Sequence, residues 1–224
     1  MLKDRVEIIR GTTLFFITAA LALIFFPGDV QGKTEPDAVV NKLRQAINRI
    51  KPFQVNFRQQ VFSDEQETTD DESVEPDIEE SGEILFSDDQ HLKWTYLKPD
   101  YKVFLLQGED YRFYDRENEQ VTVGKIRDRG RQWIWQLLFS DDILKYTRVE
   151  QPGNTIFIKK EDPQEPMNIE IHLNKDYLPV RVIQLDPGTR SRMVFHFTDY
   201  KEKIKIPKDA FDLKVPDDVE IIQE

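Results

Sequence analysis

The 224-residue sequence predicts one large antiparallel β-sheet, curled or closed into a barrel, with a helix before its first strand. Apolar residues alternate with polar ones in many short runs, which is the pattern of strands with one buried face. Turn-forming residues separate these runs at regular spacing. The apolar content is mainly aromatic and β-branched, with 15 Phe, 7 Tyr and 3 Trp against 3 Met, and this composition favours sheets.

The segment 82–115 shows this pattern best and predicts an antiparallel meander with short connections. Apolar and polar positions alternate around Ile84 and Phe86, and again around Trp94. The run Val103–Leu106 is apolar at every position, so we expect a second layer to cover its other face.

Asp37–Ile50 predicts an amphipathic helix, because apolar side chains recur there at helical spacing. Thr34 is the expected N-cap, and Lys51-Pro52 ends the helix. The period then changes to two from Phe53 to Val61, which predicts the first strand.

The second half of the chain predicts more strands, at 120–123, 145–150, 155–160, 168–174, 180–186 and 192–198, and a short edge strand at 211–216. Residues 128–139 predict a helix whose apolar residues nearly encircle it. It is either an ordinary buried helix or a removable cover over an apolar interior, and periodicity alone does not separate the two.

Residues 1–32 predict a secretory signal peptide. Basic residues precede the apolar run 14–26, which is shorter than the ~20 residues that span a bilayer; a retained membrane anchor is the alternative. We expect cleavage after Gly32, which leaves 33–224 as a single domain. Export without any cysteine fits a bacterial periplasm, where disulfides are available but not required.

The net charge of −11 excludes a nucleic-acid partner, because a phosphate backbone would be repelled. Residues 63–81 are rich in carboxylates and contain no basic residue, so we expect a solvated, mobile acidic loop. A metal site in this loop is the alternative, but the spacing of a calcium-binding loop is absent.

The sequence contains no motif that predicts an enzyme, a metal site or a cofactor. Without Cys there is no thiol nucleophile or thiolate ligand. His91, His172 and His196 are outside any His-Glu-x-x-His motif, and we expect structural roles for them. The acidic pairs 141–142 and 217–218 are expected at helix starts or turns. We therefore predict no catalytic residue, no bound metal and no cofactor.

Several motifs follow one another in a fixed order: FQVNFRQ at 53–59, GEILF at 82–86, LKWTY at 92–96 with Pro99, Gly108 with YRFYD at 111–115, and FDLKVPDDV at 211–219. Their order and spacing resemble the LolA-type periplasmic carriers of outer-membrane lipoproteins. The resemblance covers most of the mature chain.

This resemblance implies an α+β, mainly antiparallel β fold: an unclosed β-barrel, or highly curved sheet, with helices covering its concave apolar face. It implies a monomeric, non-enzymatic carrier that binds lipoprotein acyl chains in an apolar cavity. Such a carrier receives lipoproteins from an inner-membrane ABC-type lipoprotein release complex and delivers them to an outer-membrane lipoprotein receptor. That receptor is acylated on an N-terminal Cys, which this chain lacks, so the chain resembles the carrier.

If the resemblance holds, acyl chains contact the interior of the sheet and a cover that can swing aside. The expected interior residues are Trp94, Phe104, Leu106, Phe113, Ile169, Ile171, Val182 and Phe195. The expected cover residues are Trp133, Trp135, Leu137 and Leu138. For each of them, plain core packing is the alternative.

The chain departs from the family pattern at Asp88, where several members carry an Arg that latches the lid region, and in the length of its acidic loop. The alternative function is an RseB-like periplasmic lipid-sensing or regulatory module of the same fold, although those proteins usually carry a second domain. A hydrolase on the same sheet is a third, more distant hypothesis.

Overall fold

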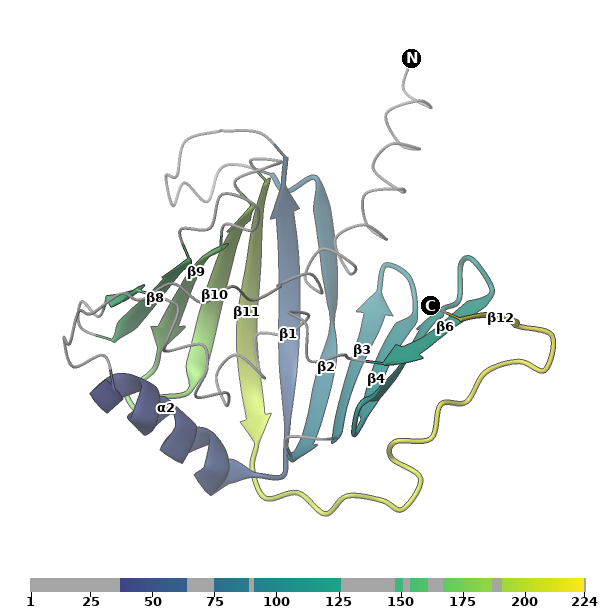
Figure 1. Cartoon of the computed structure of the whole chain (residues 1–224), viewed down its shortest axis with the longest axis horizontal. Coiled ribbons are helices and arrows are strands. Elements are labelled where there is room, and N and C mark those ends of the chain that lie inside the picture. The colour runs from purple at the N-terminus through teal and green to yellow at the C-terminus, as the bar shows by residue number, and fades with distance from the viewer. Residues whose placement is uncertain are drawn as a thin grey trace.

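The computed structural model describes residues 37–63, 75–88, 91–125, 148–150, 154–160, 167–186 and 191–223. This part of the chain forms one helix, α2 (Asp37–Ile50), and one 12-stranded sheet. Figure 1 shows the strands arranged as a fan, with α2 across one end. The strands are β1 (Phe53–Phe62), β2 (Ile78–Asp88), β3 (His91–Lys98), β4 (Lys102–Gln107), β5 (Asp110–Asp115), β6 (Gln120–Lys125), β7 (Arg148–Glu150), β8 (Thr155–Lys160), β9 (Met167–Leu173), β10 (Pro179–Asp186), β11 (Ser191–Lys201) and β12 (Glu220–Gln223).

The strand order is β12-β6-β5-β4-β3-β2-β1-β11-β10-β9-β8-β7. Neighbouring strands are antiparallel except for β12 and β6, which are parallel. The pairing of β1 with β11 joins the two halves of the sheet at its centre. The edge strands β12 and β7 do not pair with each other, so the sheet is unclosed. The predicted fold class is therefore confirmed.

Helix α2 has the predicted bounds, and one side of it is buried against the sheet. Its apolar side chains join one large cluster with side chains from β1 to β5 and from β8 to β11. We call the face of the sheet that carries this cluster the inner face, and the opposite face the outer face. The helix residues in the cluster are Val39, Val40, Leu43, Ala46, Ile47 and Ile50. Pro52 follows the helix and has no N–H with which to continue it.

The end of the chain supplies the second layer that the sequence requires over β4. A smaller cluster on the outer face contains Val103, Tyr114 and Val121, and it is covered by side chains of the C-terminal segment, namely Leu213, Val215 and Val219. The Nζ of Lys93 donates to the carbonyl oxygen of Ala210 at 3.0 Å, which ties this segment to β3. Figure 1 shows the same segment, in yellow, running past the sheet to β12.

The predicted edge strand at 211–216 is wrong: this segment is not a strand, and the last strand is β12. Leu213 and Val215 place their side chains on the outer cluster, so their backbone lies over the sheet instead of along its edge. Pro216 also lacks the N–H that a ladder needs.

The predicted acidic loop is too long at its C-terminal end, because Ile78–Ser81 belong to β2 and Ile78 pairs with Val61. Residues 64–74 of that loop lie outside the described residues, as do the predicted signal peptide at 1–32 and the predicted helix at 128–139. The strands predicted at 120–123, 155–160, 168–174, 180–186 and 192–198 are confirmed with small shifts at their ends. Of the strand predicted at 145–150, the structure describes 148–150, as β7.

Candidate functional site

The inner face brings together the residues that the sequence predicts for the interior. All of them belong to the inner cluster and are buried, with exposed fractions from 0% for Ile171 to 8% for Phe195. They come from β3, β4, β5, β9, β10 and β11: Trp94, Phe104, Leu106, Phe113, Ile169, Ile171, Val182 and Phe195. The predicted cover residues, Trp133, Trp135, Leu137 and Leu138, lie outside the described residues.

The register of the strands arranges these side chains in two rows. Trp94 pairs with Phe104, which pairs in turn with Phe113. On the other half of the sheet, Val182 pairs with both Ile171 and Phe195. Cross-strand neighbours on one face contact each other directly, so each row is a continuous apolar strip.

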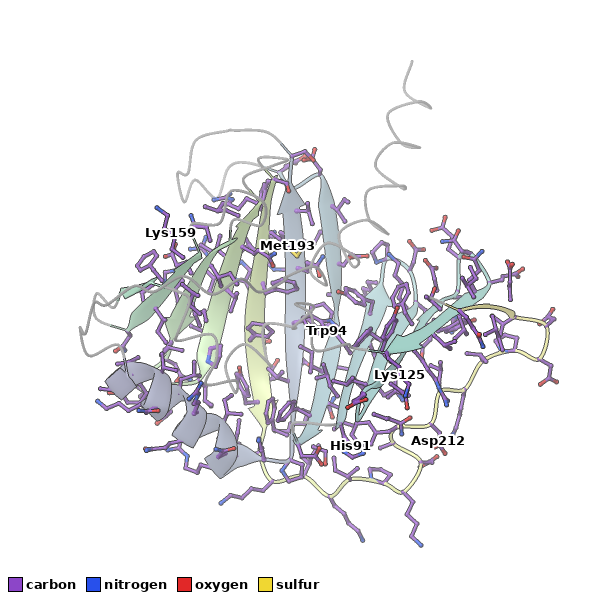
Figure 2. All side chains as sticks on the ribbon, viewed as in Figure 1. His91, Trp94, Lys125, Lys159, Met193 and Asp212 are labelled. Carbon is purple, nitrogen blue, oxygen red and sulfur yellow. The ribbon has the colours of Figure 1, made fainter. Side chains whose placement is uncertain are left out.

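Aromatic rings connect the two rows at the centre of the sheet. The ring centroids of Trp94 and Phe195 are 5.5 Å apart, although β2 and β1 separate their strands. Phe57 on β1 contacts Trp94 edge-on at 5.2 Å and Tyr96 edge-on at 5.1 Å. Figure 2 shows Trp94 near the middle of the sheet. The inner face is thus one apolar surface across both halves.

Gly82 on β2 allows these rings to meet. It pairs with Phe57 on one side and with Tyr96 on the other, and it adds no side chain between them. A Cβ at this position would collide with the backbone carbonyl of Thr95. Close approach of β2 and β3 therefore requires glycine here.

The inner face also contains a polar group that sequence reasoning missed. Lys102 on β4 pairs with Glu80 on β2, with Nζ and Oε1 2.8 Å apart, and both side chains are almost fully buried. Gln59 on β1 donates from Nε2 to Glu80 at 3.3 Å and accepts from the hydroxyl of Tyr96 on β3 at 3.0 Å. Burial, reinforced by the Glu80 carboxylate, holds the pKa of Tyr96 well above its usual range, so its hydroxyl stays a donor.

The histidines lie at or near the outer face and in no metal-like arrangement. His91 pairs with Asp88, with Nδ1 and Oδ1 2.8 Å apart, and its ring lies 5.5 Å from that of Phe211. Figure 2 shows His91 beside the C-terminal segment near Asp212. The Nε2 atom of His172 lies 2.7 Å from the Oε1 atom of Glu170. In the described ranges, no group of three or more His, Cys, Asp or Glu could hold a metal ion.

Within the described ranges, no helix has the length and apolar character needed to cross a bilayer.

Comparison with known proteins gives one consistent result. Residues 48–214 match the family model described as outer membrane lipoprotein carrier protein LolA. The outer-membrane lipoprotein carrier protein of Francisella philomiragia is 27% identical over 186 residues, which cover 80% of this chain and 86% of that protein. The protein of the same name from Pseudomonas paraeruginosa is 26% identical over 218 residues, which cover 95% of this chain and 98% of that protein.

Among solved structures, an uncharacterized conserved protein from Thermus thermophilus has the same fold. Its TM-score is 0.53 at 11% sequence identity, and the alignment covers 85% of this chain and all of that protein (100%). This likeness extends to the fold alone.

Proposed function

The chain belongs to the LolA family of outer membrane lipoprotein carrier proteins, and on that premise we propose that it carries the acyl chains of lipoproteins on the inner face of its sheet. The transport is proposed to be from the inner to the outer membrane, through a bacterial periplasm that the chain reaches by its signal peptide at 1–32. No covalent chemistry is required of the carrier.

One observation supports this proposal above the others: the apolar surface of the inner face is continuous across both halves of the sheet. A fatty acyl chain of ~16 carbons costs roughly 12 kcal/mol to hold in water, so a carrier must replace the bilayer with its own apolar surface. Rows of Trp, Phe, Ile and Val side chains on adjacent strands offer such a surface.

The proposed partners follow from the family. We expect the chain to take lipoproteins from an inner-membrane ABC-type release complex and to give them to an outer-membrane lipoprotein receptor. The cover residues predicted at 133–138 would then shield the acyl chains during transit.

A fluorescence experiment tests the proposed site. The chain has 3 Trp, so the double variant Trp133→Phe/Trp135→Phe leaves Trp94 as the sole reporter, on the inner face. A triacylated lipopeptide with brominated acyl chains should quench Trp94, because bromine quenches only at close range. The matched control is the same peptide without acyl chains, which should not quench. Saturable binding without any quenching would place the acyl chains away from the inner face.

The RseB-like sensing module differs from a carrier in what happens after binding. A carrier passes its cargo on, whereas a sensor keeps it and binds a regulatory protein. Protein purified from its native periplasm should contain triacylated peptide by mass spectrometry, and the loaded protein should release that peptide to outer-membrane vesicles. Retention of the peptide, with co-purification of one membrane-bound regulator, would favour the sensor.

A further inference from the structure

The buried polar group of the inner face consists of side chains from four consecutive strands: Gln59 on β1, Glu80 on β2, Tyr96 on β3 and Lys102 on β4. Their exposed fractions are 7%, 3%, 4% and 7%. Glu80 lies at its centre, because one carboxylate oxygen contacts the Lys102 ammonium and the other accepts from Gln59. We call these residues the inner polar group.

Stability does not account for this group. Removing a Lys–Glu pair from water costs several kcal/mol per ion, and apolar residues of similar volume often stabilise such a site equally well. On the inner face the pair borders the apolar cluster at Tyr96 and Phe104, and Lys102 also has the buried Asp115 as its cross-strand neighbour on β5. A charged pair retained in such a place suggests a role in specificity.

The group has hydrogen-bonding capacity left for a ligand. An ammonium has three N–H donors, and among the described residues that of Lys102 uses one, toward Glu80. The Tyr96 hydroxyl donates to Gln59, so its oxygen lone pairs can still accept. The group therefore offers N–H donors to carbonyl oxygens, and acceptor oxygens to amide N–H groups.

The position of the group matches the polar end of an acylated ligand. Tyr96 stacks on Trp94, with ring centroids 6.1 Å apart and planes 13° from parallel. Tyr96 and Lys102 form the cross-strand pair next to the pair of Trp94 and Phe104, which belongs to an apolar row. Hydrocarbon lying along this row would therefore pass directly beside Tyr96 and Lys102, within reach of the polar groups that join it to a peptide.

We propose that the inner polar group binds the ester and amide groups that join the acyl chains to the N-terminal residue of a lipoprotein. Lys102 donates to the ester or amide carbonyl oxygens, and Glu80 and Tyr96 accept from amide N–H. The group thereby distinguishes an acylated peptide from plain hydrocarbon. This inference rests on the proposed carrier function and deepens it by naming the part of the cargo that is recognised.

The test is the double variant Glu80→Leu/Lys102→Met, which removes both charges together and leaves neither unpaired. Two probes are titrated into it: a triacylated lipopeptide, and diphenylhexatriene, a hydrocarbon without ester or amide groups. We expect lipopeptide affinity to fall about tenfold or more, as for the loss of one or two hydrogen bonds with a charged partner. Diphenylhexatriene affinity should not change.

The matched control is Arg58→Met/Glu79→Leu, which removes an ion pair between β1 and β2 on the outer face, at the β2 residue next to Glu80. This control should bind both probes as wild type does. A second variant, Tyr96→Phe, removes one hydroxyl and should weaken lipopeptide binding by a smaller factor; it keeps the inference testable if the double variant does not fold.

The outcomes separate this inference from the proposed function. Loss of lipopeptide affinity alone supports it. Unchanged lipopeptide affinity in both the double variant and Tyr96→Phe overturns the inference and leaves the carrier function standing. An equal fall in affinity for both probes has the same meaning. Failure of the wild-type protein to bind lipopeptide overturns the carrier function and this inference together.

Discussion

The two faces of β4 show how differently the two sides of the sheet are built. Phe104 and Leu106 point into the inner cluster, which spans most of the sheet and includes helix α2. Val103 points to the other side, into a small cluster confined to β4, β5 and β6. Side chains from the last part of the same chain cover that small cluster.

Beyond this covered patch the outer face carries charged side chains and also the buried apolar pair Ile183 and Val194 on β10 and β11. On β1, β11 and β10 it presents Arg58, His196 and Arg181, which lie side by side in register. The apolar patch of Val103, Tyr114 and Val121 on the outer face therefore serves the fold, because the chain itself covers it. Among the described residues, the large apolar cluster lies on the inner face.

The largest effect is expected from Gly82→Val, which breaks the inner face. A side chain here would collide with the Thr95 carbonyl and would separate the rings of Phe57 and Tyr96. We expect a loss of more than about 4 kcal/mol in unfolding free energy, measured by urea denaturation.

The matched control for this change is Gly108→Ala. Gly108 has a φ of 65° with open space around it, so alanine there should cost only about 1 kcal/mol, from backbone strain. Equal losses for the two variants would show that β2 and β3 do not approach as closely as described.

Trp94→Ala should have the next largest effect. Trp94 is 1% exposed and contacts Phe57 and Phe195 at the centre of the inner face. Truncating a buried Trp typically costs about 3–5 kcal/mol, through lost burial and the cavity left behind. Chemical denaturation, monitored by far-UV circular dichroism, measures this loss in unfolding free energy. A loss below about 1 kcal/mol would mean that the inner face is loosely packed around this ring.

Local pattern was enough to predict the helix, the meander and the inner residues. Alternation assigns a face within one strand, and short turns between antiparallel strands keep those faces aligned, so Trp94, Phe104 and Phe113 could be assigned to one interior. The period change at Phe53 likewise marked the end of the helix and the first strand.

Features that depend on distant pairing could not be predicted in this way. Glu80 lies at the end of an acidic run, and nothing local distinguishes it from the other carboxylates there. Its burial depends on the register of β2 and on Lys102, which is 22 residues away. The parallel pairing of β12 with β6 joins Glu220 to Gln120, again without a local signal.

A smaller effect is expected on the outer face from Leu213→Ser/Val215→Ser. Both side chains are partly buried and cover the cluster of Val103, Tyr114 and Val121. We expect a loss of about 2 kcal/mol in unfolding free energy, from the apolar area returned to water. Lipopeptide affinity should not change, because the inner face is untouched. A fall in affinity comparable to that of an inner-face variant would contradict the division of roles between the faces.

The smallest effect concerns His196 on the outer face. Partial burial, and then the neighbouring Arg58 and Arg181, lower its pKa below the usual value of ~6.5, with Glu79 acting in the opposite direction. Below pH ~6.5 the unfolded chain therefore binds a proton more readily than the folded one. The contribution of the neutral imidazole to the free energy of unfolding is therefore fully present above that pH. It is lost as the pH falls toward the pKa of His196 in the folded state.

His196→Asn should remove this dependence. Urea midpoints measured from pH 8 to pH 5 should fall more for wild type than for the variant, and the difference should begin near pH 6.5. The difference should be small, because the side chain is only partly buried and solvent screens the arginines. Groups common to both proteins cancel in this comparison, so identical pH profiles would mean that burial and the neighbouring Arg58 and Arg181 do not lower the pKa of His196.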